Sequence, residues 1–451
     1  MDKKTDLTNG GILNKLIFIS APIMATSVMQ MLYNLTDMFW LGRLSSDDVA
    51  ASGAAGMFVW LGLAISALGR TGAEIGVAQN KGRGNEEAAK HYLQNAVFLA
   101  LALGITYSLT LVIGANGLLS ILKIQEAEVF SAAINYLRIV ALGIPAAFLT
   151  TTLTGAFNGS GHSRVPFYMN SAGLLLNMVL NPLVVFYTNF GIVGVALANM
   201  LAQYLVAGLL LWAIKKHKER PFAEVSLLKK PDLQRLKQIV GWGLPVSLES
   251  GFFTGLYMLV TRVITSFGSD ALAVQRVSTQ IESLSWLIGG GFGSAVTAYL
   301  GQNLGAERWD RIDKGFRIAS LAMIAWGAVV TIILFFGGYA LIGLFLRETH
   351  LREMGAFYLK LLAIGQIISS LEGVGSGYFR GIGKTVTPSV SSIVSNLIRV
   401  PLCWWLSATA LGINGVWWAI TLTAMLRGAA VYGFALIRQL KNRRHQVQTT
   451  A

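Results

Sequence analysis

Twelve long apolar stretches follow one another along this chain, separated by short polar loops. A run of about 20 apolar residues can cross the hydrocarbon core of a bilayer as a helix. The stretches lie near residues 14–42, 49–78, 91–115, 130–156, 166–188, 192–214, 238–267, 271–300, 316–346, 355–379, 387–410 and 413–437. Because these runs are continuous and do not alternate over ~10-residue segments, they favour helices over strands. We therefore predict an all-α integral membrane protein with twelve transmembrane helices.

The distribution of charge predicts the topology of such a protein. Only 13% of the residues are charged, against about 25% in a soluble domain. The net charge of +14 comes from Lys and Arg in both tails and in alternate loops, above all the loop after residue 214. Since basic residues mark the cytoplasmic side, both termini are expected in the cytoplasm. The positive charge is thus explained by topology and does not indicate nucleic-acid binding.

No motif in the sequence points to catalysis. The single cysteine, Cys403, excludes an intrachain disulfide and a thiolate metal site. The sequence contains no His-rich metal spacing, nucleophile elbow, P-loop or sizeable soluble domain. We therefore expect neither an enzyme nor a bound metal or cofactor, and no ATP-driven mechanism.

The second half of the chain repeats the first. Four short motifs recur in the same order at an offset of 221 to 223 residues: 78–82 at 301–305, 136–143 at 358–365, 155–161 at 377–383 and 191–195 at 412–416. Each half holds six spans, so the repeats run parallel about an axis along the membrane normal. This predicts two pseudo-symmetric six-helix bundles around a central cleft, residues 1–214 and 238–451, joined by a basic cytoplasmic connector, 215–237. A short surface helix is expected from Leu233 to Ile239.

Proline and glycine mark places where the helices can bend or pack closely. Pro22 and Pro245 occupy matching places in spans 1 and 7, and a proline inside a helix removes a backbone hydrogen bond and kinks it. We predict that both are hinges. The glycine-rich run 289–293 in span 8 is consistent with either a flexible point in the helix or a close-packing face.

Asp37 lies inside the first apolar stretch. An ionised Asp costs roughly 2.5–3.5 kcal/mol at the centre of a membrane helix on insertion scales, so its carboxylate needs polar partners. The polar residues that share its helix face are Tyr33, Asn34 and Gln30. One interpretation is a carboxylate that reaches the membrane–water interface beside Trp40 and Arg43. The interpretation we prefer is an acid that titrates and binds cations.

The ordered set of paired motifs resembles the multidrug and toxic compound extrusion (MATE) family over nearly the whole chain. The shared features are the two Gln-Asn-x-Gly loops, the two Gly-x-Phe-x-Gly-x-Gly loops and the acid in span 1. The resemblance implies a secondary antiporter of a bacterial plasma (inner) membrane that expels organic compounds in exchange for H⁺ or Na⁺. NorM-like members carry acids in spans 7 and 10. By ungapped placement those positions here are Phe253 and Ser369, which favours the DinF-like branch. Glu249 and Glu372 lie nearby on other helix faces, and a placement shifted by one turn would make either of them the equivalent acid.

The resemblance also implies a cation-coupling cluster around the acid of span 1. Carried over, the cluster comprises Asp37, Tyr33, Asn34, Asn177, Asn181 and Asn199. Many relatives have an Asp where this chain has Asn181, so a single carboxylate remains. We expect Asp37 to attract a cationic drug when ionised and to release it when protonated from outside, while span 1 changes its bend near Pro22.

A soft, apolar drug site is expected near this cluster. Methionine adapts to irregular ligands, and aromatic rings add cation–π contacts. The candidate contacts are Asp37, Gln30, Met31, Tyr33, Met57, Met169, Asn170, Met178, Tyr257 and Met258. The alternative for each apolar candidate is plain packing or contact with lipid. The expected partners are lipophilic, often cationic drugs and dyes, H⁺ or Na⁺, and the bilayer, with the protein a monomer.

Two other functions remain open. A Na⁺-coupled drug antiporter would use the same oxygen ligands. A flippase for a lipid-linked oligosaccharide would need a cleft lined with Arg or Lys to hold pyrophosphate, and Arg262, Arg276 and Arg399 keep that alternative open.

Overall fold

The computed structural model describes residues 5–188, 190–216, 221–222, 226 and 230–450, with side chains described as far as Asn442. This part of the chain contains twelve α-helices and no strand, as predicted. The helices are α1 Ile12–Leu44, α2 Ser46–Gly82, α3 Glu86–Ser120, α4 Ala127–Gly159, α5 Arg164–Tyr187, α6 Gly191–Lys216, α7 Leu233–Thr265, α8 Ser269–Gly305, α9 Trp309–Gly343, α10 Thr349–Gly381, α11 Val386–Ser407 and α12 Ile413–Thr450.

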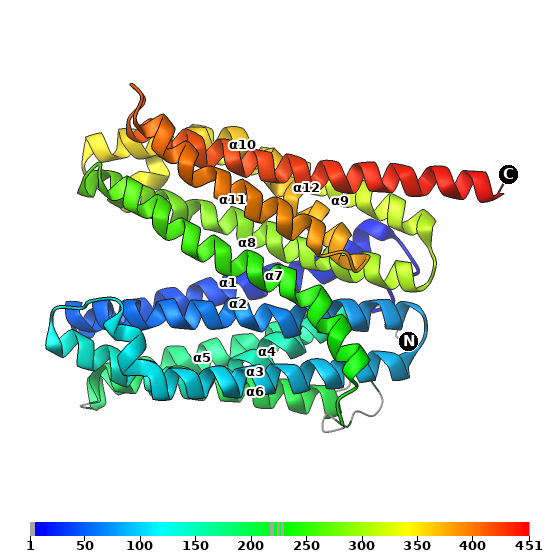
Figure 1. Cartoon of the computed structure of the whole chain (residues 1–451), viewed down its shortest axis with the longest axis horizontal. Coiled ribbons are helices and arrows are strands. Elements are labelled where there is room, and N and C mark those ends of the chain that lie inside the picture. The colour runs from blue at the N-terminus through cyan, green and yellow to red at the C-terminus, as the bar shows by residue number, and fades with distance from the viewer. Residues whose placement is uncertain (1–4, 189, 217–220, 223–225, 227–229, 451) are drawn as a thin grey trace. The chain divides into compact units, whose positions relative to one another are not determined.

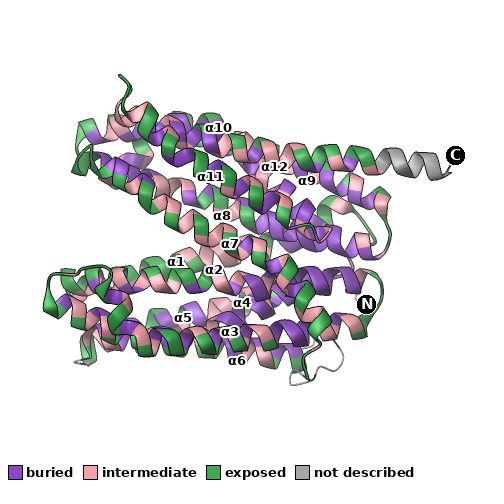
Figure 2. Ribbon diagram, viewed as in Figure 1, coloured by how far each residue is buried: buried purple, intermediate pink, exposed green. Residues whose placement is uncertain are grey.

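The surface of the helices is strongly apolar. Within the described residues, nine helices are long and apolar enough to span a membrane; α7, α8 and α11 are not among them. Those three carry charged side chains such as Glu249, Glu282 and Arg399, which lower their mean hydropathy. Many large apolar side chains are exposed, including Ile113 and Phe336 at 79% exposure each, and Figure 2 shows exposed residues along the helices of both units. Such faces suit contact with lipid.

The chain forms two compact units with the same internal packing. The first consists of Met1–Leu7 and Ala21–Ser247, the second of Thr8–Ser20 and Leu248–Ala451. In the first, α4 packs against α2, α3 and α6, and α5 against α6; in the second, α10 packs against α8, α9 and α12, and α11 against α12. Figure 1 shows the helices of each unit running side by side. The matching neighbours are what a duplicated six-helix bundle requires.

Glycines bring helices of the first unit into backbone contact. A Cβ added at Gly155 of α4 would lie 2.6 Å from the carbonyl oxygen of Arg70 in α2, and one at Gly159 would lie 2.4 Å from that of Glu74. The spacing of four places both glycines on one face. Such small-residue faces let membrane helices approach closely.

The second unit repeats this contact between α10 and α8. A Cβ at Gly373 would lie 2.5 Å from the carbonyl oxygen of Gly289, and one at Gly377 would lie 2.5 Å from that of Gly293. Two of the glycines in the run 289–293 therefore belong to a close-packing face, one of the two alternatives that the sequence left open.

One local prediction was wrong. The surface helix expected from Leu233 to Ile239 is the start of α7, which continues past Pro245 to Thr265; a proline inside a membrane helix bends it without ending it. Ile239 is fully buried in the core of the first unit, where a Cβ on Gly72 would lie 2.4 Å from its Cγ2. Within the predicted connector, residues 217–220, 223–225 and 227–229 lie outside the described residues.

The glycine contacts predict matched effects on stability in both units. Gly155→Val and Gly377→Val should each lower the free energy of unfolding by about 1–3 kcal/mol, the usual cost of overpacking, measured by thermal unfolding of the purified protein in detergent. Gly208→Ala is the control, because a Cβ there meets nothing within 4 Å and alanine favours the helix. Unchanged stability in both valine variants would contradict the assigned contacts.

Candidate functional site

The carboxylate of Asp37 is held by two amides from other helices of the first unit. Its Oδ1 accepts a hydrogen bond from Asn181 Nδ2 of α5 at 3.0 Å. Its Oδ2 accepts one from Asn199 Nδ2 of α6 at 2.6 Å. The carboxylate therefore points toward α5 and α6, where amides hold it. It does not extend along its own helix toward Trp40 and Arg43, as a side chain reaching the membrane–water interface would.

Further hydrogen bonds link the amides to one another. Asn199 Oδ1 accepts from Tyr33 Oη at 2.8 Å and from Asn177 Nδ2 at 2.6 Å. Asn177 Oδ1 in turn accepts from Asn181 Nδ2 at 3.1 Å. Asn177 and Asn181 are fully buried, and Asn199 is 8% exposed. Together with Asp37, these residues form the Asp37 cluster, which joins α1, α5 and α6.

Energetics favour this arrangement for an ionised carboxyl group. A hydrogen bond to a charged group is worth about 1.5–3 kcal/mol, so two of them offset the roughly 2.5–3.5 kcal/mol cost of an Asp deep in a membrane helix. An ionised carboxylate accepts only, and both contacting groups are N–H donors. The observed pattern is therefore complementary to the anion.

The structure separates the predicted coupling residues into two groups. Asp37, Tyr33, Asn177, Asn181 and Asn199 are brought together.

Asn34 and Gln30 share the helix but are exposed, and neither donates to nor accepts from the Asp37 cluster within the described part of the chain. The structure therefore does not bring Asn34, a predicted coupling residue, into the cluster, and the substrate contact predicted for Gln30 stays a prediction.

The predicted substrate contacts are spread over both units. In the first unit, Met57 and Met178 are 42% and 41% exposed, Met169 packs against the core, and Met31 is partly buried.

Asn170 donates to the carbonyl of Pro166, one turn back in its own helix, at 2.6 Å. In the second unit, Met258 is 44% exposed, and Tyr257 stacks on Phe253 with ring centroids 6.2 Å apart.

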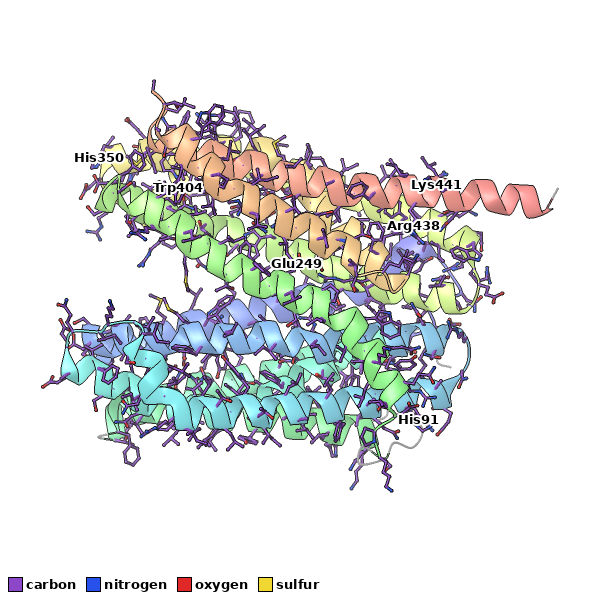
Figure 3. The ribbon with its side chains drawn as sticks, viewed as in Figure 1. His91, Glu249, His350, Trp404, Arg438 and Lys441 are labelled. Carbon is purple, nitrogen blue, oxygen red and sulfur yellow. The ribbon has the colours of Figure 1, made fainter. Side chains whose placement is uncertain are left out.

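The second unit contains a different polar cluster. Glu372 of α10 pairs with Arg427 of α12, with 2.8 Å between Oε2 and Nε. Glu249 of α7 (Figure 3) accepts from Ser389 Oγ at 2.8 Å. Glu249 also interacts electrostatically with Glu372 and Arg427. Glu249 and Glu372, which lie near the positions of the NorM-like acids in spans 7 and 10, thus both interact with Arg427.

Two more residues extend the polar interior of the second unit. Glu282 of α8 accepts from Gln366 Nε2 at 3.2 Å. Arg399 of α11, only 9% exposed, donates through Nε to Thr423 Oγ1 at 2.8 Å. Arg262 and Arg276, in contrast, are exposed. The three arginines considered for pyrophosphate binding therefore differ in environment.

Sequence reasoning missed two residues of these clusters. Tyr136 of α4, 7% exposed, interacts with both Asp37 and Asn199. The repeated motif that begins with Tyr136 and Tyr358 was visible in the sequence and could have pointed to it. Arg427 was not singled out, because no sequence spacing links it to its partner Glu372.

Comparison with known families gives a match in each half of the chain. A family model described as MatE matches residues 22–183 and 245–405. The "Probable multidrug resistance protein NorM" of Thermotoga maritima is 25% identical over 412 residues, which cover 90% of this chain and 88% of the relative. The "Probable multidrug resistance protein YpnP" of Bacillus subtilis is 26% identical over 432 residues, which cover 95% and 96%.

Solved structures share the fold. A crystal structure of MATE in the bent conformation has a TM-score of 0.92 and 22% identity, covering 99% of this chain and 100% of that chain. The straight conformation also gives 0.92, with 21% identity and coverage of 98% and 100%. The DinF-like assignment stays a prediction.

The Asp37 cluster predicts energetic coupling between its members. Asn199→Leu should destabilise the protein by about 1–3 kcal/mol, because it leaves buried polar groups unpaired. In a double-mutant cycle with Asp37→Asn, measured by thermal unfolding in detergent, the two effects should depart from additivity by about 0.5–3 kcal/mol. Tyr33→Phe, which removes one neutral donor, should cost only about 0.5–1.5 kcal/mol. Strict additivity would mean that the two side chains do not interact.

Proposed function

The chain belongs to the MatE family, and on that basis we propose that it exports lipophilic, often cationic organic compounds in exchange for H⁺. As a member of this family it is a multi-pass membrane transporter and not an enzyme. The multidrug resistance names of its relatives support drug-like substrates.

The single observation that carries the proposal is the donor-lined carboxylate of Asp37. The anion is complementary both to its N–H donors and to a cationic drug. Protonation removes the charge, and with it the attraction for the drug. One site that binds a proton or a drug, but not both, produces antiport by competition.

The proton gradient supplies enough free energy to concentrate a drug outside the cell. Exchange of one H⁺ for one monovalent cation moves no net charge, so the pH gradient drives it, with about 1.4 kcal/mol or a tenfold concentration ratio per pH unit. For a neutral drug the cycle moves one elementary charge, and 100 mV adds about 2.3 kcal/mol, about 50-fold in concentration. One carboxylate is therefore enough for a useful drug gradient.

We also propose that Pro22 and Pro245 are hinges for alternating access. The division between the two units falls after Ser20 in α1 and after Ser247 in α7, close to the two prolines. Both prolines lie inside their helices, where each removes a backbone hydrogen bond. A change of bend at these places moves one part of each helix with each unit.

The topology follows from charge. We place the protein in a bacterial plasma (inner) membrane as a monomer, with both termini and the basic connector 215–237 in the cytoplasm. The halves 1–214 and 238–451 remain our proposed repeats of one ancestral bundle.

The alternatives have less support. Na⁺ would need several oxygen ligands at once. In the Asp37 cluster both carboxylate oxygens, Asn199 Oδ1 and Asn177 Oδ1 already accept hydrogen bonds, and of the amide oxygens there only Asn181 Oδ1 has no partner in the described structure. For the flippase, Arg262 and Arg276 are exposed and Arg399 bonds to Thr423, so these arginines give no specific reason to prefer it. We therefore favour H⁺.

Neutralising Asp37 should abolish coupled exchange. In proteoliposomes that contain Asp37→Asn, efflux of rhodamine 123 under a pH gradient alone should fall at least about 100-fold, because a carboxamide cannot exchange a proton near neutral pH. A sodium gradient alone should drive no efflux through the unmodified protein. Asp270→Asn is the control, since Asp270 is exposed and contacts His350. Unchanged exchange in Asp37→Asn would refute the proposal.

The methionines should set the substrate profile. Met31→Ala, Met169→Ala and Met258→Ala should each change the ratio of export rates for two dyes of different shape by at least about fourfold, the value of one buried methylene. The assay is efflux from cells that lack other pumps. Ile113→Ala, on a highly exposed face, should leave the ratio unaltered. Identical profiles in all three variants would remove these residues from the site.

A further inference from the structure

The hydrogen bonds of the Asp37 cluster lead, donor to acceptor, to the carboxylate of Asp37. Tyr33 and Asn177 both donate to Asn199, and Asn199 donates to Asp37. The direction is fixed by the carboxylate, because an ionised carboxyl group can only accept. A protonated Asp37 would instead present an O–H donor, and one neighbouring amide would then have to turn its oxygen toward it.

Asn199 is poorly suited to make this turn. Its Oδ1 accepts two hydrogen bonds, from Tyr33 at 2.8 Å and from Asn177 at 2.6 Å. A turn of its amide would break both bonds and bring its own N–H groups toward the N–H group of Asn177. Asn199 is therefore fixed in the orientation that serves the anion.

Asn181 is in the opposite situation. Its Oδ1 is buried and has no hydrogen-bond partner, although the side chain is fully buried. Its Nδ2 donates to Asp37 and to Asn177. A turn would break one bond besides the one to Asp37, that to Asn177, and bring its Oδ1 toward the Oδ1 of Asn177. It would also give the unpaired oxygen a donor, the protonated acid.

We infer that Asn181 is the amide that turns when Asp37 takes up a proton, so that protonation is transmitted first to α5. This inference rests on the proposed function, in which Asp37 exchanges protons. Asn181 is a positioning residue in it: it accepts from the protonated acid and donates to the anion. Its amide has both kinds of group, and a half-turn exchanges them.

The surroundings of Asn181 favour a side-chain turn before a shift of the helix. A Cβ added at Gly173 of α5 would lie 2.2 Å from Val206 Cγ2, and one at Gly194 of α6 would lie 2.0 Å from Val184 Cγ1. Tight contacts therefore join α5 and α6 on both sides of the cluster. Pro182 follows Asn181 inside α5 and lacks an N–H, so α5 can bend at that point once the amide has turned.

No other charge competes with this response. The titratable groups that interact with Asp37 are the phenols of Tyr33, on its own helix, and Tyr136, on α4. From α5 and α6 it meets the neutral amides of Asn177, Asn181 and Asn199. Proton uptake at Asp37 therefore acts on the amides directly.

Threonine and valine at position 181 test the inference. They have nearly the same shape, but the threonine hydroxyl can donate to the anion or accept from the acid. In the full-length protein in proteoliposomes, rhodamine 123/H⁺ exchange should fall at least about tenfold in Asn181→Val and stay within about threefold of the unmodified protein in Asn181→Thr. Asn396, which donates to its own helix, gives the matched control pair: Asn396→Thr and Asn396→Val should not differ.

A spectroscopic measurement separates this inference from the proposed function. Infrared pH-difference spectra should show a band for the protonated carboxyl group of Asp37, identified by its loss in Asp37→Asn. The band should move to the position of a free carboxyl group in Asn181→Val and stay in place in Asn181→Thr. If the band titrates but the two variants agree, Asn181 has no such role although Asp37 still exchanges protons. If no band titrates, the proposed function and this inference both fail.

Discussion

Two amide hydrogen bonds to the carboxylate of Asp37 connect helix α1 to helices α5 and α6. Helix α1 is not among the closely packed helix pairs of the described chain. Its side-chain hydrogen bonds to α5 and α6 come from Asp37, through Asn181 and Asn199, and from Tyr33, through Asn199. Because charged hydrogen bonds lose much of their strength when the charge is removed, the protonation state of this one group affects how firmly α1 is held.

The two units share a packing scheme and differ in what they enclose. Glycine faces on α4 and α10 make the same close contacts with α2 and α8, and these contacts fix the backbones. The polar interiors are free to diverge around that frame. The first holds one acid among amides, whereas the second pairs Glu372 with Arg427 and buries Arg399. The duplicated fold therefore encloses a lone acid among amides in one half and an ion pair in the other.

Local information predicted the helices, and the resemblance predicted most of the Asp37 cluster. Hydropathy depends on neighbours in sequence, so all twelve helices were visible. The spacing of Asn177 and Asn181 placed both on one face. Tyr136 and Arg427 were missed, because their contacts join helices that are distant in sequence. The expected break after Ile239 was wrong, since a proline before a helix says nothing about where the helix ends.

The amide of Asn181 explains how, in the proposed mechanism, a single carboxylate can serve two states. Two nearby carboxylates could share a proton, and each would respond to the charge of the other. A lone carboxylate needs a neighbour that tolerates both its forms. An amide provides this, because it carries a donor and an acceptor on one planar group and can exchange them by rotation. The buried, unpaired oxygen of Asn181 is the acceptor that the ionised state leaves unused.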